Sequence, residues 1–456
     1  MKKSPIQPKP KTIPAAPTKP SSRLEPSHFE SLYPADSRFE EIEKIISFIK
    51  NGSSCQLVGL PGTGKSNLLG LLTYNRNARL AHLGETQKWF HFVYMDFSEI
   101  KKRPLSDVIK FMIISLSYSL QERGLKKEYE RVHGILGDIR DFSDELIAFQ
   151  ALKKIIDYLA IEKELTIVFL FDRFDQYVPN ISEEFFSDLK ILRNRAKYRF
   201  SCVFALNREL SDLIEPTVFA EFYEFLAGNV VFLKLRDEPG LSFRLAYLEK
   251  AVGKKIDKTK SEEITRLTAG HGKLTRLSYE AILSETSKIS DLIKLLLSKK
   301  TIQGALFEIW NSLTAEERQG IKRGDRNEFL EKVGLITNDK IKIPLFESFI
   351  TTLTPLTAQK LNYDPIRNEI LKGDQNLTEL LSPQEFRLLQ FLLQNPGRVC
   401  EKDEIISNVW RDTKTREGVT DQALDQIIYR LRKKIEEDPN IPRFIQTIKG
   451  RGYRSP

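Results

Sequence analysis

A glycine-rich segment near the amino terminus has the residue types and spacing that bind nucleotide phosphates. Residues 59–66 read GLPGTGKS and fit the pattern G-x-x-x-x-G-K-[ST] without a gap. Glycines let the backbone wrap around phosphate groups, and backbone N–H groups at the start of the next helix point toward them. Lys65 is expected to reach the β- and γ-phosphates of ATP, and the Ser66 hydroxyl to bind Mg²⁺. The residues expected to hold the nucleotide are Gly59, Pro61, Gly62, Thr63, Gly64, Lys65, Ser66 and Asn67.

A second motif, an apolar run that ends in an acid, indicates the metal side of the same site. Residues 166–172 read TIVFLFD, and an acid that ends a buried parallel strand lies at the carboxyl edge of the sheet. Asp172 is therefore expected to help bind Mg²⁺. Many ATPases of this kind place a glutamate next, which orients the attacking water, but Arg173 stands here. Asp175 is a candidate substitute, and we predict slow Mg²⁺-dependent hydrolysis, with the nucleotide acting as a switch.

Two further polar positions are candidates for sensing the nucleotide. Asn207 ends the next apolar run, where it could contact the γ-phosphate, although an ordinary strand-ending asparagine is the alternative. Arg276 opens a helix after the turn at residues 270–272, and it could reach the phosphates when that region closes; a solvated arginine is equally compatible. His271 in this turn is interpreted as a capping or packing residue.

The elements that must position these residues alternate between strands and helices. Five strand-like runs are separated by helical stretches, which predicts a parallel sheet with helices on its faces. These runs are residues 56–58, 90–95, 166–171, 202–206 and 230–235. Residues 240–300 then have helical patterns. Residues 301–356 show two helices and a β-like end at residues 340–344, in the order of a small winged helix.

Residues from about 30 to 356 resemble the AAA+ and STAND groups of ATPases, close to the archaeal origin-recognition type. The resemblance implies an α/β P-loop fold, a helical lid and an ATP-gated change in lid position or assembly. It also implies a homo-oligomer in which a neighbour supplies an arginine, although no residue of this chain identifies that arginine. The features that carry the resemblance are Arg38, residues 59–66, 171–172 and 207–208, the lid and the winged helix.

The last hundred residues predict a DNA-reading unit. Residues 381–385 contain a capping box with proline at the first helical position, and a second helix is expected over residues 402–410. A third helix over residues 420–435 has one apolar stripe and an opposite polar face. Amides on such a face pair with adenine edges, and basic groups pair with guanine or phosphate. The predicted DNA-contacting residues are Gln422, Gln426, Tyr429, Arg430, Lys433, Lys449 and Arg451.

This ordering closely resembles the winged-helix effector domain of OmpR/PhoB-type response regulators. The resemblance implies that residues 420–435 enter the major groove of duplex DNA and that the wing at residues 449–454 contacts the backbone or minor groove. It also implies that the loop at residues 411–419 touches RNA polymerase. The usual receiver domain is missing, and the ATPase occupies its place. The matching pieces are residues 381–386, 395–399, 409–410, 424–425, 430–433 and 447–454.

Composition limits the remaining classes of function. The chain of 456 residues has a net charge of +9, and residues 1–27 and 428–456 are strongly basic while the middle is near neutral. Basic ends favour contact with a polyanion, although a solvated surface is the alternative. Three distant cysteines and the lack of a long apolar run exclude a disulfide scaffold, a zinc finger and a membrane span. We therefore expect a cytoplasmic, nucleoid-associated protein.

The combined interpretation is a transcription regulator whose binding to double-stranded DNA, or whose assembly, is gated by ATP. One alternative is a DNA-handling ATPase, such as a replication initiator or a mobile-element accessory protein, in which both winged helices grip DNA. Another is a signalling or defence switch whose last domain binds protein. The expected divisions are a basic proline-rich disordered arm, an ATPase core, a lid, a middle winged helix and the DNA-binding domain, over residues 1–30, 31–236, 237–300, 301–356 and 357–456.

Overall fold

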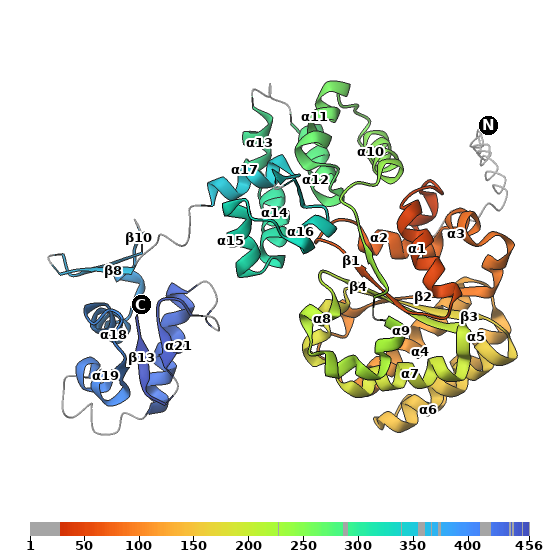
Figure 1. The fold of residues 1–456 in the computed structure, drawn as a ribbon, viewed down its shortest axis with the longest axis horizontal. Coiled ribbons are helices and arrows are strands. Elements are labelled where there is room, and N and C mark those ends of the chain that lie inside the picture. Colours follow the sequence, from red (N-terminus) through yellow and green to blue (C-terminus); the bar gives the residue numbers. More distant parts are fainter. Residues whose placement is uncertain are drawn as a thin grey trace, which may run out of the picture. The chain divides into compact units, whose positions relative to one another are not determined.

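A computed structural model describes most of the chain, which forms two compact units. The units are Met1–Phe349 and Ile350–Pro456 (Figure 1). Residues 1–27, the greater part of the predicted basic arm, lie outside the described residues, as do the predicted polymerase-contacting loop and Lys449. The described residues are 28–226, 228–285, 291–338, 340–353, 361–365, 367–372, 375–410, 421–436, 439, 442–448 and 450–455.

The first unit is built on a five-stranded parallel sheet with the strand order β2-β3-β4-β1-β5. Because β1, β3 and β4 are neighbours and parallel, the residues that follow their carboxyl ends meet at one edge. The parallel α/β fold predicted for this region is confirmed. The strands are β1 (Cys55–Val58), β2 (Phe90–Asp96), β3 (Thr166–Asp172), β4 (Phe200–Leu206) and β5 (Val230–Phe232).

Strand β5 is shorter than the apolar run at residues 230–235 predicts. Its partner β1 ends at Val58, which pairs with Phe232, and the glycine-rich loop begins immediately afterwards. One further bond joins the backbone N–H of Leu233 to the carbonyl of Val58 at 2.7 Å. Beyond that point β1 offers no ladder, so the remaining apolar residues leave the sheet.

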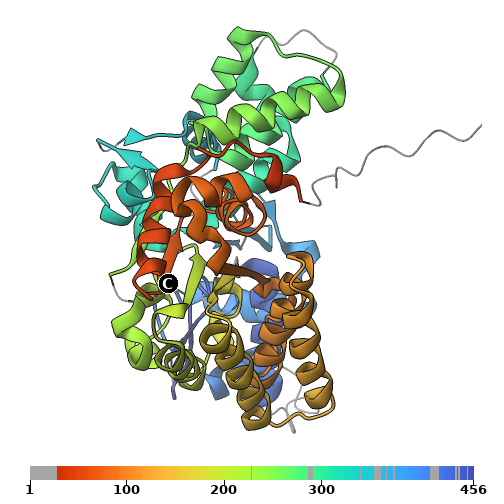
Figure 2. The same cartoon turned by 90° about the vertical axis from the view of Figure 1, so that its right-hand side faces the viewer.

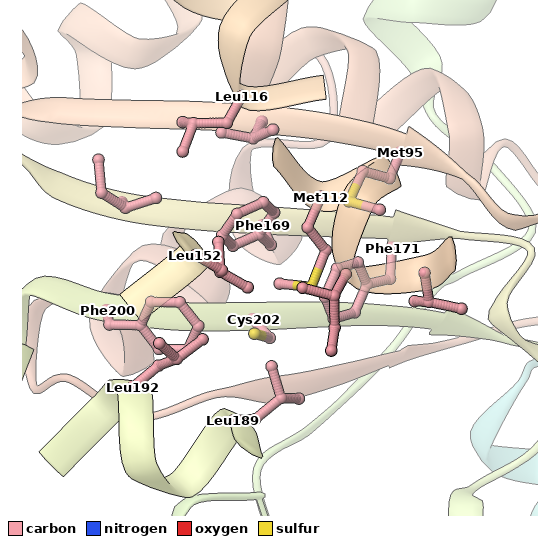
Figure 3. Close-up of a cluster of buried hydrophobic side chains, with 14 of the residues drawn as sticks. Met95, Met112, Leu116, Leu152, Phe169, Phe171, Leu189, Leu192, Phe200 and Cys202 are labelled. Atoms are coloured by element: carbon pink, nitrogen blue, oxygen red, sulfur yellow. The ribbon is translucent and has the colours of Figure 1, made fainter. Parts of the chain in front are cut away.

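Both faces of the sheet are buried under helices. Along β3, Phe169 and Phe171 point to one face and Val168 and Leu170 to the other, which is the period-two alternation of a strand. On the first face, Figure 3 shows Phe169 and Phe171 packed with apolar side chains from α4, α6 and α7. Two views place α1, α2 and α3 on the opposite side of the sheet from α4–α7 (Figures 1 and 2). These helices are α1 (Phe39–Lys50), α2 (Lys65–Tyr74), α3 (Arg76–Leu83), α4 (Leu105–Glu122), α5 (Lys126–Ile139), α6 (Glu145–Ile156) and α7 (Glu183–Ala196).

A helical region (α10 to α13) and a small helix–hairpin module (α14 to α17, with the hairpin β6–β7) complete the first unit. The predicted β-like end is confined to a two-stranded hairpin, and residues 345–350 belong to a helix that starts at Pro344, a residue suited to a first helical position. Short helices α8 (Leu210–Leu213) and α9 (Tyr223–Leu226) precede β5. The later elements are α10 (Glu238–Val252), α11 (Lys258–Thr268), α12 (Gly272–Leu283), α13 (Leu292–Ser298), α14 (Lys300–Ser312), α15 (Ala315–Arg323), α16 (Glu328–Lys332), β6 (Ile336–Thr337), β7 (Lys340–Ile341) and α17 (Pro344–Thr352).

The second unit combines three helices with two small antiparallel sheets, ordered β10-β9-β8 and β11-β13-β12. Its core joins Leu388 of α18, Ile405 of α19 and Leu431 of α21, all of them fully buried. The predicted capping box is present, with Ser382 and Glu385 bonded to each other's backbone and Pro383 in the first turn. The elements are β8 (Leu361–Asp364), β9 (Glu369–Lys372), β10 (Gln375–Asn376), α18 (Pro383–Gln394), β11 (Cys400–Glu401), α19 (Lys402–Val409), α21 (Asp421–Ile435), β12 (Gln446–Ile448) and β13 (Gly452–Arg454).

Membrane-spanning helices are missing from the described part of the chain. The longest described helices there lack the length and apolar character that a bilayer crossing requires.

Candidate nucleotide site and candidate DNA-binding face

The glycine-rich loop lies between β1 and α2 and borders a cavity of about 900 Å³. Gly62 and Gly64 have φ angles of 81° and 106°, in the left-handed region that favours glycine. A Cβ atom on Gly62 would lie 2.8 Å from the Cε1 atom of His271, so this glycine also permits close approach of a neighbouring element. The loop therefore has the conformation and surroundings of a phosphate-binding turn at a helix start.

Lys65 turns its ammonium group back onto this loop and toward the end of β4. Its Nζ donates to the carbonyl oxygens of Gly59 at 2.5 Å and Leu60 at 3.2 Å, and to Oδ1 of Asn207 at 3.0 Å. Burial lowers the pKa of Lys65 to about 8, while the carboxylates of Asp175 and Asp172 act in the opposite direction. The ammonium group is thus held by neutral oxygens that a phosphate can replace.

The acidic side of the cavity is formed by residues that follow β3. Asp172 is 1% exposed, and its Oδ2 accepts a hydrogen bond from the Tyr94 hydroxyl at 2.6 Å. Asp175 Oδ2 accepts from the Asn207 amide at 2.9 Å, and burial raises the pKa of this carboxyl group. Lys65, Asn207 and Asp175 therefore form one continuous hydrogen-bonded chain. Sequence reasoning missed Tyr94, because its contact depends on the pairing of β2 with β3.

Arg173 directs its side chain away from this chain of groups. Its φ angle is 53°, a left-handed conformation that is uncommon outside glycine. The guanidinium lies 3.2 Å from Oδ2 of Asp96 and donates to Ser98 Oγ at 3.4 Å. Position 173, where the sequence resemblance implies a glutamate, thus forms a cation–carboxylate pair at the end of β2.

The start of α12 is docked on the phosphate-binding loop. Nε2 of the buried His271 lies 2.9 Å from the Pro61 carbonyl oxygen, and its Nδ1 accepts from the Leu274 backbone N–H at 3.3 Å. These partners assign the ring proton to Nε2. Burial lowers the pKa of His271 to about 4, so the ring is neutral at physiological pH. The backbone N–H of Lys273 also donates to the Gly62 carbonyl at 3.0 Å, which fixes α12 against the loop.

Two arginines contribute to the same region in different ways. Arg38, which precedes α1, donates to the carbonyls of Thr63 at 2.7 Å and Lys234 at 2.8 Å, and so ties the loop to the segment after β5. Arg38 was among the residues that carry the family resemblance, but the sequence did not predict these hydrogen-bond partners. Arg276 lines the cavity as expected for a phosphate-facing residue, but its guanidinium is paired with Glu280 at 2.6 Å on the same helix.

The residues of the cavity fit a nucleotide polyphosphate with a divalent cation. Ser66, Lys65, Asp172 and Asn207 all line it. The amide oxygens of Asn67 and Gln176, two residues that border it, are buried without a hydrogen-bond partner among the described residues. Within the described segments, no group of three or more His, Cys, Asp or Glu side chains could hold a metal. A cation here would therefore need oxygens from the ligand and from water as well as from Ser66 and Asp172.

The residue next to Asn207 connects the nucleotide site to the helix–hairpin module. Arg208 forms a largely buried ion pair with Glu317 at the start of α15 and donates to the Ser312 carbonyl at 3.0 Å. Its guanidinium also lies 4.5 Å from the ring centroid of Phe329 in α16. Lys332 lies 5.4 Å from the ring centroid of Phe232 at the end of β5. Sequence reasoning did not find this interface, since its partners are 109 residues apart.

In the second unit, α21 presents the predicted polar face to solvent. Gln422, Gln426, Tyr429, Arg430 and Lys433 are all exposed, while the apolar stripe of the helix is buried. The Lys433 ammonium lies 4.6 Å from the centroid of the Tyr429 ring. Among the described residues, none forms a hydrogen bond with the side chain of Gln422 or Gln426. This face is therefore available for groups outside the unit.

Other basic groups of α21 have structural partners. Arg432 donates to the Ile445 carbonyl at 2.7 Å, and Lys434 donates to Glu385 at 2.5 Å and to the Leu380 carbonyl at 3.0 Å. Arg432 and Lys434 are therefore bonded within the unit, although the Lys434 side chain is also exposed.

The wing consists of β12 and β13, as the alternating pattern predicts. Arg451 is exposed in the turn between these strands. A side chain at Gly452 would place its Cβ 2.0 Å from the Cys400 carbonyl oxygen, so this close strand approach requires glycine. The Tyr453 hydroxyl donates to Asp425 of α21 at 2.6 Å and joins the wing to the helix, a contact that the sequence did not indicate. Lys449 lies outside the described residues.

Comparisons with known structures give low similarity over most of the chain. A Walker-type ATPase of Pyrococcus abyssi is 17% identical with a TM-score of 0.46, over 72% of this chain and 99% of that chain. The ORC1 protein of Aeropyrum pernix, solved in complex with DNA, is 14% identical with a TM-score of 0.35, over 92% of this chain and 88% of that chain.

Comparisons with curated sequences are stronger but confined to the second unit. Protein PetR of Rhodobacter capsulatus is 38% identical over 100 residues, and the phosphate regulon transcriptional regulatory protein PhoB of Escherichia coli is 35% identical over 99 residues. Each match covers 22% of this chain, and this chain spans 41% of the length of each relative. Residues 376–455 match the family "Transcriptional regulatory protein, C terminal". Residues 376–455 are therefore a DNA-binding domain of the OmpR/PhoB type, carried on a chain whose first unit is a parallel α/β fold with a G-x-x-x-x-G-K-[ST] loop.

Proposed function

We propose that this protein is an ATP-binding, sequence-specific transcription regulator in which the nucleotide state gates DNA binding or assembly. The observation that carries the proposal is the adjacency of Asn207 and Arg208. Asn207 accepts a hydrogen bond from Lys65 in the nucleotide site, and Arg208 holds Glu317 of the next module. A change at the glycine-rich loop that moves Asn207 would therefore also move Arg208, the next residue, and its contact with Glu317.

Residues on three sides of the cavity would hold ATP and Mg²⁺. The loop amides and Lys65 would bind the phosphates, and Ser66 and Asp172 would bind the cation, with Asn67 and Arg276 near the nucleotide. Bound ATP supplies negative charge that competes with Gly59 and Asn207 for the Lys65 ammonium. The Asn207 amide would then be released to find a new partner while Arg208 still anchors it from the other side. Only a difference in ATP affinity between two arrangements can shift their populations.

The DNA-binding part of the proposal rests on the exposed face of α21 and the wing. Gln422 and Gln426 would read base edges, and Tyr429, Arg430, Lys433, Lys449 and Arg451 would contact bases or the backbone. The relatives PetR and PhoB share this domain, and PhoB is named as a transcriptional regulatory protein. RNA polymerase contact, ATP-dependent homo-oligomers, nucleoid association and slow hydrolysis are further parts of the proposal.

The geometry favours this reading over one in which both winged helices grip DNA. Phe329 in α16 lies beneath the Arg208 guanidinium, and Lys332 of the same helix is stacked on Phe232. The helix of the middle module that would enter a groove therefore already faces the ATPase core. A duplex would have to displace these contacts.

The direct test is selection of bound duplexes from a random pool, followed by affinity measurements on the selected site with ATP, ADP and no nucleotide. We expect the wild-type affinity or binding stoichiometry to differ between ATP and the other two conditions. Lys65→Ala should remove nucleotide binding and this difference, while retaining basal DNA binding. Lys44→Ala, which changes an exposed lysine on α1, is the matched control. Identical DNA binding by the wild type in all three conditions would refute the gating proposal.

A further inference from the structure

ATP hydrolysis requires a group that orients the attacking water, and position 173 does not supply one. Arg173 carries a cation rather than a carboxylate, and its guanidinium is engaged by Asp96 and Ser98 at the end of β2. A change of rotamer would still offer only hydrogen-bond donors to a water molecule. Within this chain, the other polar side chains of the cavity are the candidates for this group.

The obvious polar side chains of the cavity already have partners. The Asp172 carboxylate accepts from Tyr94 and from the Arg173 backbone, and it is the proposed cation ligand. The Asp175 carboxylate accepts from the Asn207 amide, whose oxygen accepts in turn from Lys65. A water oriented by Asp175 would compete with the hydrogen bond that this carboxylate accepts from Asn207.

Gln176 lines the same cavity and has unused hydrogen-bonding capacity. Its amide oxygen has no partner among the described residues and is buried, so a rotation of the side chain is needed to bring this oxygen into the cavity. A buried amide oxygen without a partner is costly in a folded protein. The segment that carries Gln176 is firmly placed, because Phe174 and Tyr177 on either side are 0% and 1% exposed. The Gln176 backbone N–H also donates to the Arg173 carbonyl at 3.0 Å.

We propose that Gln176 orients the water that attacks the γ-phosphate of ATP, in place of the acid absent at position 173. This inference rests on the proposed ATP-binding function. The water oxygen forms a bond to the γ-phosphorus as the bond from that phosphorus to the β,γ-bridging oxygen breaks, and ADP leaves with the electron pair. One water proton stays on inorganic phosphate, and the other passes to solvent. The Gln176 amide accepts a hydrogen bond from the water and is not itself protonated, as glutamine does in some GTPases.

A neutral amide positions water without acting as a strong base, which accounts for hydrolysis that is slow and suited to a switch. The same assignment separates the roles of two neighbours: Asp175 supports Asn207, and Gln176 serves the water. Loss of Gln176 should therefore affect hydrolysis without affecting nucleotide affinity.

The test uses the full chain and three measurements: affinity for a fluorescent ATP analogue, single-turnover hydrolysis with Mg²⁺, and the tightening of ADP binding by aluminium fluoride. Gln176→Ala should keep ATP affinity within about twofold, slow single turnover about 100-fold and lose the tightening by aluminium fluoride. Gln121→Ala, at an exposed glutamine near the end of α4, should match the wild type in all three measurements.

The proposal would be overturned if Gln176→Ala hydrolysed ATP at the wild-type rate and kept the tightening of ADP binding by aluminium fluoride. It would also be overturned if Asp175→Asn lost both properties while Gln176→Ala kept them. A wild-type chain that binds ATP but shows neither hydrolysis nor tightening would also overturn it, while leaving nucleotide binding intact. Failure of the wild type to bind any nucleotide would instead refute the proposed function, and this inference with it.

Discussion

The candidate nucleotide site and the candidate DNA-binding face differ in how their polar side chains are bonded. In the first unit, Lys65 and Asn207 are held by hydrogen bonds to other groups of the site, and Arg208 is held by the next module. In the second unit, Gln426 and Lys433 lie exposed on α21. One region is an internally bonded network that a ligand must rearrange, and the other is a solvated surface that a ligand covers.

This difference predicts how each region responds to substitution. Removing one member of a buried network leaves its partners without hydrogen bonds. The loss of stability is therefore large and extends to groups that the removed side chain did not contact. Removing an exposed side chain alters only its own contact with the ligand, and for a charged group that contact is screened by salt. The predictions below test this contrast from the largest expected effect to the smallest.

Arg208→Ala should be the most damaging of these substitutions. It leaves the Glu317 carboxylate, whose side chain is 6% exposed, without its cation, and we expect a loss of about 3 kcal/mol in the free energy of unfolding of the first unit. Denaturant unfolding of the full chain, followed by a probe in this unit, measures the effect. The matched control is Arg199→Ala, which breaks an exposed pair with Glu164 and should cost less than about 1 kcal/mol. Equal costs would remove the contrast between buried and exposed charges.

Two adjacent lysines of α21 should separate DNA binding from stability. Lys433→Ala should weaken DNA binding by about 1 to 2 kcal/mol and lower the salt slope of binding by about one, without changing stability. Lys434→Ala should instead destabilise the second unit, because it leaves the buried Glu385 without its ion-pair partner. Binding titrations at several salt concentrations and thermal unfolding distinguish the two. If Lys434→Ala changed only the salt slope, the assignment of internal and exposed charges on this helix would be wrong.

The affinity for ATP should fall as the pH rises above 8. Burial lowers the pKa of Lys65 to about 8 in the free protein, whereas a bound phosphate favours the protonated ammonium and raises this pKa. Binding therefore takes up a proton above pH 8, and its free energy becomes less favourable there. We expect about threefold weaker binding at pH 8.5 than at pH 7.5. A flat nucleotide profile would contradict the Lys65 assignment.

Much of the fold could be predicted from local sequence signals. The five apolar runs, the glycine-rich loop and the capping box at Ser382 fell within one or two residues of the observed elements, except that β5 is shorter. These features depend on short-range preferences for strand alternation, glycine conformation and helix capping. The carboxyl-terminal unit was predictable for the same reason, and its family match agrees.

The partners of the site residues were less predictable. Tyr94 reaches Asp172 only because β2 pairs with β3, and Arg208 reaches Glu317 only because α15 packs near the end of β4. His271 meets Pro61 across 210 residues of chain. Such contacts depend on strand order and on the packing of distant helices, which no short pattern encodes.

By itself, the sequence determined the local chemistry of this protein: a loop whose glycines and lysine suit phosphates, a strand that ends in an acid, and a helix with an apolar and a polar face. These follow from spacing, because backbone conformation and amphipathic periodicity are set by residues a few positions apart. The tertiary structure alone decided which polar side chains form hydrogen bonds within the protein and which remain free to bind a ligand. It paired Arg173 with Asp96 and left the Gln176 amide oxygen without a partner among the described residues, because burial and pairing are properties of the folded chain.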